Sequence, residues 1–458
     1  MGKASKALSS FVASLRFEDL PNEVISSLHL WALDTIGCGM NGAKEPSNHI
    51  LLSSYKDLDV VKGSTVWNSS METDAATAAM LNGALSHTIE LDDDHRTGTI
   101  HTGVVVWPTV FALGEEFGIS GKEALTAAAA GYETGIRIGR AFLGNMFYQG
   151  FHPTGVCGVF AAAAAAGKIL GLTEEQQNHA FGIAGSMASG NREWKTTGAW
   201  TKRIQAGHAN WGGVRAAKMA KCGFTGPSDF LEGQFGLFNA YSYQKQYDAQ
   251  LVMNGLGEGY ELLDNSLKPH ASCRFAQPII DSTLNIVLAN DIQPDDIAHI
   301  RVGVGKNSLL ALTEPADRKY RPQNRVDAQF SLPYAAAVAV HRRKAFIDEY
   351  QPHSFTDLKI LSTADKVSYF LDPWAESLWP MCYAASVEIE TTKGARLFDR
   401  TDYPKGDPEN PMTAEEVVTK FNILMQDVGL SERADEISRS ILALSESANI
   451  SPTIKLLQ

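Results

Sequence analysis

The hydrophobic positions in the first half of the chain follow one another at helical spacing. Apolar residues recur through 24–36 behind Pro21, a residue that suits the first turn of a helix. Ser120 stands three positions before Glu123, which is the capping-box pattern of a helix start. Alanine runs such as 161–166 form helices well and have little bulk, so we expect them at buried contacts between helices.

The pattern changes after about residue 260. Ile297–Val304 and Ala385–Thr391 alternate apolar and polar residues, which predicts strands, and a Lys-Gly turn then leads into a further extended segment at 395–398. Helical spacing fills the stretches at about 328–342 and 356–369. After a segment rich in proline and glycine at 403–411, a capping box at Thr413 and Glu416 marks the return of helix.

This order predicts a mainly α protein with a large all-helical domain and a smaller α+β domain inserted within it. We place the helical domain at residues 1–264 and 401–458 and the insert at 265–400. A chain of 458 residues is longer than one core usually supports, which agrees with two domains. Clefts between domains are common binding sites for small molecules, so we expect the functional site there.

Composition excludes several functional classes. The net charge is −12 and no basic cluster occurs, so we expect neither nucleic acid nor an anionic membrane as a partner. The start of the chain lacks the apolar stretch of a signal peptide, and the longest apolar runs are too short to span a membrane. The five cysteines are dispersed without a CxxC pair, which argues against a cysteine-bound metal or cluster and favours reduced thiols in the cytoplasm.

The densest group of titratable residues is the segment ELDDDHRTGTIHT at residues 90–102. It contains three consecutive aspartates, Asp92 to Asp94, and two histidines, His95 and His101, around a glycine-broken loop. Like charges this close repel one another unless a cation, a metal or a proton lies among them. The segment is therefore either part of a functional site or a solvated acidic turn that caps the next helix.

Two later segments add cations and a third histidine. His152 stands in FHPTGV directly before an alanine-rich helix, where it could serve function or only cap the helix. Lys202 and Arg203 lie among glycines at 198, 207, 212 and 213, which would allow close approach of a ligand. The alternative is a plain Lys-Arg pair on the surface.

The junction between the predicted domains reads KPHASCR. Lys268, His270, Cys273 and Arg274 follow one another within seven residues, which is unusual for a linker, although a solvated connector remains the alternative. Tyr334 opens a helix after FSLP; aromatic residues at such positions are usually part of the core.

The lysines, arginines, histidines and aspartates of these segments together are suited to proton transfer on a carboxylic acid. Neither a nucleotide-binding glycine loop nor a GxSxG nucleophile motif occurs. Lysine and arginine bind carboxylates, and removal of a proton beside a carboxylate builds charge that fixed cations stabilise while histidine or aspartate takes the proton. Dehydration, decarboxylation and epimerisation of polycarboxylates all use this step.

Four motifs together resemble the MmgE/PrpD family of 2-methylcitrate dehydratases, cis-aconitate decarboxylases and iminodisuccinate epimerases. They are ALSHTIELDDDH with a following histidine, FHPTGV, TKRIQAGHA and KPHASCRFAQP, spread over residues 84–278. The resemblance implies a large helical domain that contains both termini, a smaller α+β lid domain, and homodimers.

The resemblance also implies the catalytic positions: Asp93, His101, His152, Lys202 and Lys268. We expect Lys202 to anchor a substrate carboxylate, His101 and His152 to exchange protons with the substrate, and Asp93 to orient a histidine. Lys268 would reach the cleft when the lid closes. For substrate binding we expect the further residues His95, Arg203, His270, Arg274 and Tyr334, with neither a metal nor another cofactor.

The chain departs from the family pattern in several places. Thr102 and Gly103 follow His101 where relatives have Pro-Ser, Asp94 replaces a threonine or tyrosine, and His270 and Ser272 replace a tyrosine and a cysteine. The lid histidine of the animal decarboxylases has no match near position 273. These departures argue against the animal decarboxylase activity.

The sequence therefore predicts a cofactor-independent lyase of a di- or tricarboxylate, most like a 2-methylcitrate dehydratase. A cis-aconitate-type decarboxylase, an iminodisuccinate-type epimerase and a non-catalytic carboxylate-binding protein on the same scaffold are the alternatives. Proton-transfer groups favour an enzyme, because binding alone needs only cations.

Overall fold

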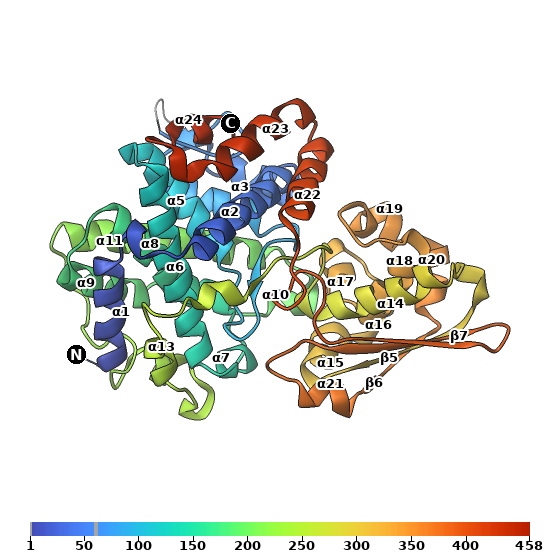
Figure 1. The fold of residues 1–458 in the computed structure, drawn as a ribbon. Coiled ribbons are helices and arrows are strands. Elements are labelled where there is room, and N and C mark those ends of the chain that lie inside the picture. Colours follow the sequence, from blue (N-terminus) through green and yellow to red (C-terminus); the bar gives the residue numbers. More distant parts are fainter. Residues whose placement is uncertain (1, 59–62) are drawn as a thin grey trace.

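The computed structural model describes residues 2–58 and 63–458, which form two bodies side by side (Figure 1). The larger body contains both ends of the described chain, and the C-terminal helices return to it after the smaller body. Its helices are α1 (Lys3–Ser14), α2 (Asn22–Gly42), α3 (Pro46–Ser53), α4 (Ala75–Ser86), α5 (Gly103–Phe117), α6 (Gly121–Ala141), α7 (Asn145–Tyr148), α8 (Pro153–Ile169), α9 (Glu174–Gly185), α10 (Trp194–Thr197), α11 (Thr201–Lys221), α12 (Leu237–Tyr241), α13 (Gln250–Met253), α22 (Ala414–Asp427), α23 (Ser431–Leu442) and α24 (Ser451–Lys455).

Small residues allow the central helices to pack closely. The alanine-rich α8 packs against α6 and α11. A Cβ atom at Gly213 of α11 would lie 2.4 Å from the Cβ atom of Ala162 in α8, so glycine is required there. The predicted capping boxes at Ser120 and Glu123 and at Thr413 and Glu416 are confirmed at the starts of α6 and α22.

The larger body is helical but not all-helical, which corrects the prediction. Two short antiparallel pairs occur in it: β1 (Ser64–Thr65) with β2 (Glu72–Thr73), and β3 (Asp94–His95) with β4 (Asn265–Ser266). Two-residue strands of polar residues carry no alternation that a sequence pattern could reveal. The second pair matters because it ties the end of the acidic segment to the chain just before Lys268.

The smaller body is a four-stranded sheet with helices packed on it. The strand order is β6-β5-β7-β8, with β5 and β6 parallel and the other pairs antiparallel. Helix α14 packs on β7 and β8, and α18 contacts β6. Its elements are α14 (Gln277–Ala289), β5 (Ile297–Val304), α15 (Lys306–Leu312), α16 (Ala316–Tyr320), α17 (Arg325–Gln329), α18 (Leu332–Arg342), α19 (Pro352–Phe355), α20 (Leu358–Ala364), β6 (Val367–Leu371), α21 (Pro373–Ser377), β7 (Ala385–Thr391) and β8 (Arg396–Thr401).

The two main strands have their predicted bounds, whereas the predicted helices of this body were partly wrong. The stretch at 328–342 is broken between α17 and α18, where Ser331 accepts a hydrogen bond from the Tyr334 N–H at 3.0 Å and caps the second helix. The predicted helix at 356–369 ends at Ala364, and Val367–Leu371 is a strand. Pairing with β5, which lies far away in sequence, decides the conformation of this segment.

The bodies have separate hydrophobic cores that meet at a few side chains. The core of the larger body contains residues between Ala4 and Leu267 and between Val417 and Leu457, and most of the core of the smaller one lies between Ala271 and Ile389. Ile89, Leu91 and Trp194 belong to the larger body by sequence but pack into the core of the smaller one. The junction therefore runs along the acidic segment and α10. No helix within the described ranges is both long and apolar enough to cross a membrane.

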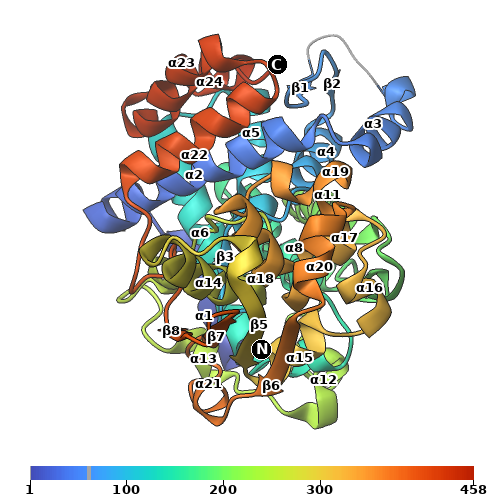
Figure 2. The same cartoon turned by 90° about the vertical axis from the view of Figure 1, so that its right-hand side faces the viewer.

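A buried lysine holds the C-terminal helices to this junction. Figure 2 shows α22 lying along α2. From α22, the Lys420 ammonium lies 2.5 Å from Asp34 Oδ1 of α2 and donates to the carbonyl oxygens of Leu91 and Lys268 at 2.7 and 2.8 Å. Lys420 and Asp34 are 4% and 2% exposed, so water cannot replace either partner.

We predict that Lys420→Met strongly destabilises the fold. The substitution leaves the Asp34 carboxylate and two carbonyl oxygens buried without their cation, which typically costs about 3–5 kcal/mol. Urea unfolding of the purified protein measures the loss. Lys405→Met, which removes an exposed ion pair with Glu416, is the control and should cost less than about 1 kcal/mol. Equal losses in the two variants would contradict the prediction.

Candidate active site

A pocket opens at the junction of the two bodies, with about 650 Å³ of empty space that includes the solvent at its mouth. Its polar lining on the side of the larger body includes Glu90, Asp94, His101, His152 and Lys202. The smaller body contributes Cys273, Arg274, Phe275, Phe330 and Tyr383. Of the predicted site residues, the structure therefore brings His101, His152, Lys202 and Arg274 together in one cavity.

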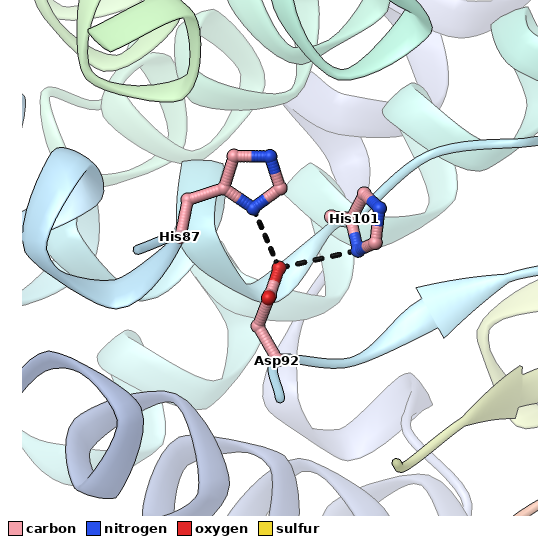
Figure 3. A group of neighbouring side chains, drawn as sticks. All are labelled: His87, Asp92 and His101. Atoms are coloured by element: carbon pink, nitrogen blue, oxygen red, sulfur yellow. Dashed lines mark hydrogen bonds and ion pairs between the residues drawn. The ribbon is translucent and has the colours of Figure 1, made fainter. Parts of the chain in front are cut away.

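One carboxylate joins two histidines beneath this pocket. Asp92 Oδ2 lies 2.8 Å from His87 Nδ1 and 3.1 Å from His101 Nδ1, as Figure 3 shows. His87 and Asp92 are fully buried, whereas His101 is partly exposed toward the pocket. Burial alone would raise the pKa of Asp92, but His87, Lys268 and His101 hold it well below its ordinary value. The carboxylate thus stays ionised and fixes the orientation of both rings.

The hydrogen bonds of the pocket histidines define which ring nitrogen carries the proton. His101 Nδ1 also lies 2.8 Å from the carbonyl oxygen of Asp93, which can only accept, so this nitrogen is the protonated one. His152 Nδ1 lies 2.8 Å from Gln205 Oε1, and the Gln205 amide nitrogen donates to the carbonyl oxygen of Asn191, which orients the amide. In both histidines Nδ1–H is therefore the donor, and Nε2 is left for the pocket.

The electrostatic environment keeps His152 neutral. Burial, with His87 and Lys202 nearby, holds the pKa of His152 well below its ordinary value. The rings of His87 and His152 stack at 5.6 Å between centroids, and burial together with Lys202 lowers the pKa of His87 to about 4. A neutral imidazole with a free Nε2 can accept a proton, so His152 has the properties of a general base.

Two lysines neutralise the carboxylates of the loop. Lys202 forms an ion pair with Glu90. Lys268 Nζ lies 3.8 Å from Asp92 Oδ1 and 4.0 Å from Glu90 Oε2, and it donates to the Glu90 carbonyl oxygen at 3.2 Å. Burial opposes the charge of Glu90, but Lys202 and Lys268 outweigh it and lower the pKa of Glu90 to about 2. Lys268 is fully buried beneath the loop and does not line the pocket.

Asp93, the acid that the sequence favoured, points away from the pocket. Its carboxylate accepts from Tyr132 Oη and Asn265 Nδ2, each at 2.8 Å, and from the Gly103 N–H at 2.9 Å. Burial raises the pKa of Asp93 to about 7, although these donors favour its ionised form. The contacts connect the acidic segment to the start of α5, to α6 and to β4. Only the Asp93 carbonyl oxygen touches His101.

Four predicted substrate-binding residues lie outside the pocket. His95 is buried against the Glu261 carbonyl oxygen, at 3.2 Å from Nε2. Arg203 donates to the Ser47 hydroxyl. In the smaller body, His270 pairs with Asp281 at 2.8 Å and Tyr334 donates to the Glu349 carbonyl oxygen at 2.5 Å within the core. The fifth, Arg274, lines the pocket, where its Nε lies 3.4 Å from Asp94 Oδ2.

Several pocket residues were missed from the sequence. Glu90 and Asp94 both stand in the acidic segment, each two residues from Asp92. In a strand that spacing would place all three side chains on one face, but this segment is a loop, so the spacing does not predict which side chains face the pocket. Arg192, Trp194 and Lys195 line the pocket from the segment before α11, which contains no recognisable motif.

Two groups of side chains within the described ranges bring three possible metal ligands together. They are His87 with Asp92 and His101, and His95 with Glu261 and Asp264. In the first group the distances are those of hydrogen bonds, and His101 Nδ1 already donates to a carbonyl oxygen. The expectation of a metal-free site stays a prediction.

Comparison with known proteins agrees with the motifs. Residues 6–250 match the MmgE/PrpD N-terminal domain and residues 270–446 match the MmgE/PrpD C-terminal domain. The cis-aconitate decarboxylase-like protein oryM of Aspergillus oryzae is 28% identical over 100% of this chain and 97% of its own.

Two further relatives extend the comparison. A cis-aconitate decarboxylase of Aspergillus terreus is 27% identical over 98% of this chain and 94% of its own. A 2-methylcitrate dehydratase of Escherichia coli is 22% identical over 89% and 87%. With both family domains matched in order along a mainly α fold, and with the four motifs meeting at the junction of two bodies, the chain belongs to the MmgE/PrpD family.

Proposed function

We propose that this protein is a lyase that acts on a di- or tricarboxylate by proton transfer at the carbon beside a carboxylate. The observation that carries the proposal is the pair of oriented histidines, His101 and His152, whose Nδ1 atoms are hydrogen-bonded within the protein and which line a pocket that also contains Lys202. A substrate carboxylate beside Lys202 would develop negative charge during the reaction, and the ammonium would stabilise that charge.

The roles of the two histidines differ in this proposal. His152 is neutral and accepts a proton at Nε2. His101 has Asp92 at Nδ1 and Asp94 Oδ1 at 4.0 Å from Nε2, so an imidazolium there has an anion on both sides and can donate a proton. Lys268 positions the loop from below, and Asp93 anchors it, rather than either touching the substrate.

Decarboxylation is the reaction that the relatives favour, in place of the dehydration expected from the sequence. The cis-aconitate decarboxylase and the decarboxylase-like protein from Aspergillus match this chain at higher identity and over more of its length than the dehydratase does. In this step the bond to one carboxylate breaks, carbon dioxide leaves, and the electron pair on carbon takes a proton from His101.

Dehydration is the second candidate, because the pocket offers both a base and an acid. His152 would take the C–H proton and His101 would protonate the departing hydroxyl group. Decarboxylation needs only the acid, His101. The presence of a second oriented histidine, His152, is therefore the observation that supports dehydration as an alternative.

The proposal has three further parts. The smaller body acts as a lid, supported by its residues Cys273, Arg274, Phe275 and Tyr383 on one wall of the pocket. No cofactor takes part, because histidines and lysines can supply the proton transfer and the charge stabilisation. A cytoplasmic homodimer is the expected form, from the dispersed cysteines and the family resemblance.

The product identifies the reaction. Wild-type protein is incubated with cis-aconitate, citrate and 2-methylcitrate, and proton NMR follows the products with and without EDTA. We expect cis-aconitate to be converted to the dicarboxylate that remains after loss of carbon dioxide, at a rate unchanged by EDTA. Loss of water from a citrate would assign dehydration instead. Binding of these acids without any conversion would leave a carboxylate-binding protein and contradict the proposal.

We predict that His101→Ala lowers kcat by about 10²–10⁴ in either reaction, because it removes the acid. His152→Ala should lower kcat as much if the reaction is dehydration, because it removes the base, and neither variant should unfold the protein. Steady-state kinetics with circular dichroism measures both effects. His270→Ala is the matched control, since its ring pairs with Asp281 outside the pocket, and it should keep a rate near that of wild type. Near-normal kcat in both pocket variants would refute the assignment.

The pH dependence follows from the depressed pKa of His152. A base whose pKa lies below 6.5 remains unprotonated as the pH falls from 8 to 6.5, and it is lost only at lower pH. For dehydration, which uses this base, we therefore expect the acid limb of the kcat/KM profile well below pH 6.5. A limb at or above pH 6.5 would show that His152 is not the base.

A further inference from the structure

The cations of the pocket fall into two groups. Lys202 and Arg274 already face carboxylates, those of Glu90 and Asp94. Arg192 and Lys195 also line the pocket, yet neither has a carboxylate within ion-pair distance among residues 2–58 and 63–458. Glu193, which stands between them in sequence, is exposed and accepts from the Thr196 hydroxyl at 3.0 Å.

Arg192 is held in place by uncharged partners. Its guanidinium carbon lies 3.3 Å from the centroid of the Phe147 ring, and one terminal nitrogen donates to the Phe147 carbonyl oxygen at 2.9 Å. Burial lowers the pKa of Arg192 to about 10, which shows that its charge is desolvated without full compensation. The remaining N–H groups bond to no acceptor in the described part of the chain. A planar guanidinium fixed in this way is suited to bind a carboxylate through two parallel hydrogen bonds.

Lys195 stands one turn further along. Its backbone N–H donates to the Arg192 carbonyl oxygen at 3.1 Å, and its ammonium donates to the Leu310 carbonyl oxygen of α15. Burial, with Arg192 nearby, lowers the pKa of Lys195 as well. Two adjacent half-buried cations repel each other, so an anion between them would stabilise both.

The backbone places this pair beside the proposed base. The His152 N–H donates to the Gly190 carbonyl oxygen and the Arg192 N–H donates to the Gly150 carbonyl oxygen, each at 2.9 Å. Gln205 reinforces the pairing, because it binds His152 with its oxygen and the Asn191 carbonyl oxygen with its nitrogen. These hydrogen bonds therefore fix the position of the Arg192 backbone relative to His152.

We infer that Arg192 and Lys195 form a second carboxylate subsite, separate from Lys202, which binds a substrate carboxylate that takes no part in the bond changes. The inference rests on the proposed function and deepens it. It assigns the substrate class: acids that carry one carboxylate in addition to those that the reaction requires. The aromatic rings of Phe147, Trp194 and Phe330 line the same pocket and would contact the carbon chain between the two carboxylates.

A pair of isosteric ligands tests the subsite without turnover. Propane-1,2,3-tricarboxylate and 2-ethylbutanedioate differ by one terminal carboxylate, which is a methyl group in the second acid. Isothermal titration calorimetry gives the Kd of each for wild type, Arg192→Met and Lys195→Met. The matched controls are Arg301→Met, an arginine 4.2 Å from the Phe370 ring, and Lys366→Met, a lysine that donates to the Ile297 carbonyl oxygen at 2.7 Å.

We expect wild type to prefer the tricarboxylate by about tenfold or more, the usual worth of one charge-assisted contact. Each pocket variant should reduce this preference to about threefold or less, while both controls retain it. A preference unchanged in Arg192→Met and Lys195→Met, or absent in wild type, would overturn the inference.

The experiments distinguish a failure of the subsite from a failure of the proposed function. If wild type shows the predicted ligand preference but converts no polycarboxylate, the subsite stands and the lyase assignment falls. If it converts a polycarboxylate while the pocket variants keep the preference, the lyase stands and the subsite falls.

Discussion

The burial of carboxylates in the acidic loop is the constraint on which the rest of this structure depends. Glu90 and Asp92 are almost or fully excluded from water, and an isolated buried carboxylate would be far too costly to keep ionised. The loop is stable only because Lys202 and Lys268 reach it from other parts of the chain. A third lysine, Lys420, binds the carbonyl oxygens of Leu91 and Lys268 from the C-terminal helices. The same set of charges therefore fixes the fold of the junction and assembles the pocket.

This charge balance also defines the state of the histidines. Asp92 remains an anion because cations surround it, and it can then orient both His87 and His101. His152 instead is buried near His87 and Lys202, which holds its pKa well below the ordinary value, and it stays neutral. The surrounding residues thus give the imidazoles of His101 and His152 different properties, which is what an acid and a base in one pocket require.

The sequence predicted the helical body, the main strands and three of the five catalytic candidates in the pocket, because each has a local signal. Capping boxes and alanine runs report helices, and His101, His152 and Lys202 stand in motifs. The acidic loop shows where such reasoning ends. Its three aspartates are consecutive, and no period tells which one faces the pocket, so Asp93 was favoured although its carboxylate binds Tyr132 and Asn265. Strand β6 was missed because its conformation depends on β5, far away in sequence.

The central claim is that His152 presents an unprotonated Nε2 to the pocket at neutral pH. Nitrogen-15 NMR of histidine-labelled protein reports the protonation of each ring nitrogen, and His152→Ala assigns the signals. At pH 7 we expect His152 to be neutral, with the proton on Nδ1 donated to Gln205 and the signal of a bare nitrogen at Nε2. A His152 ring protonated on both nitrogens at pH 7, or on Nε2 alone, would contradict the account.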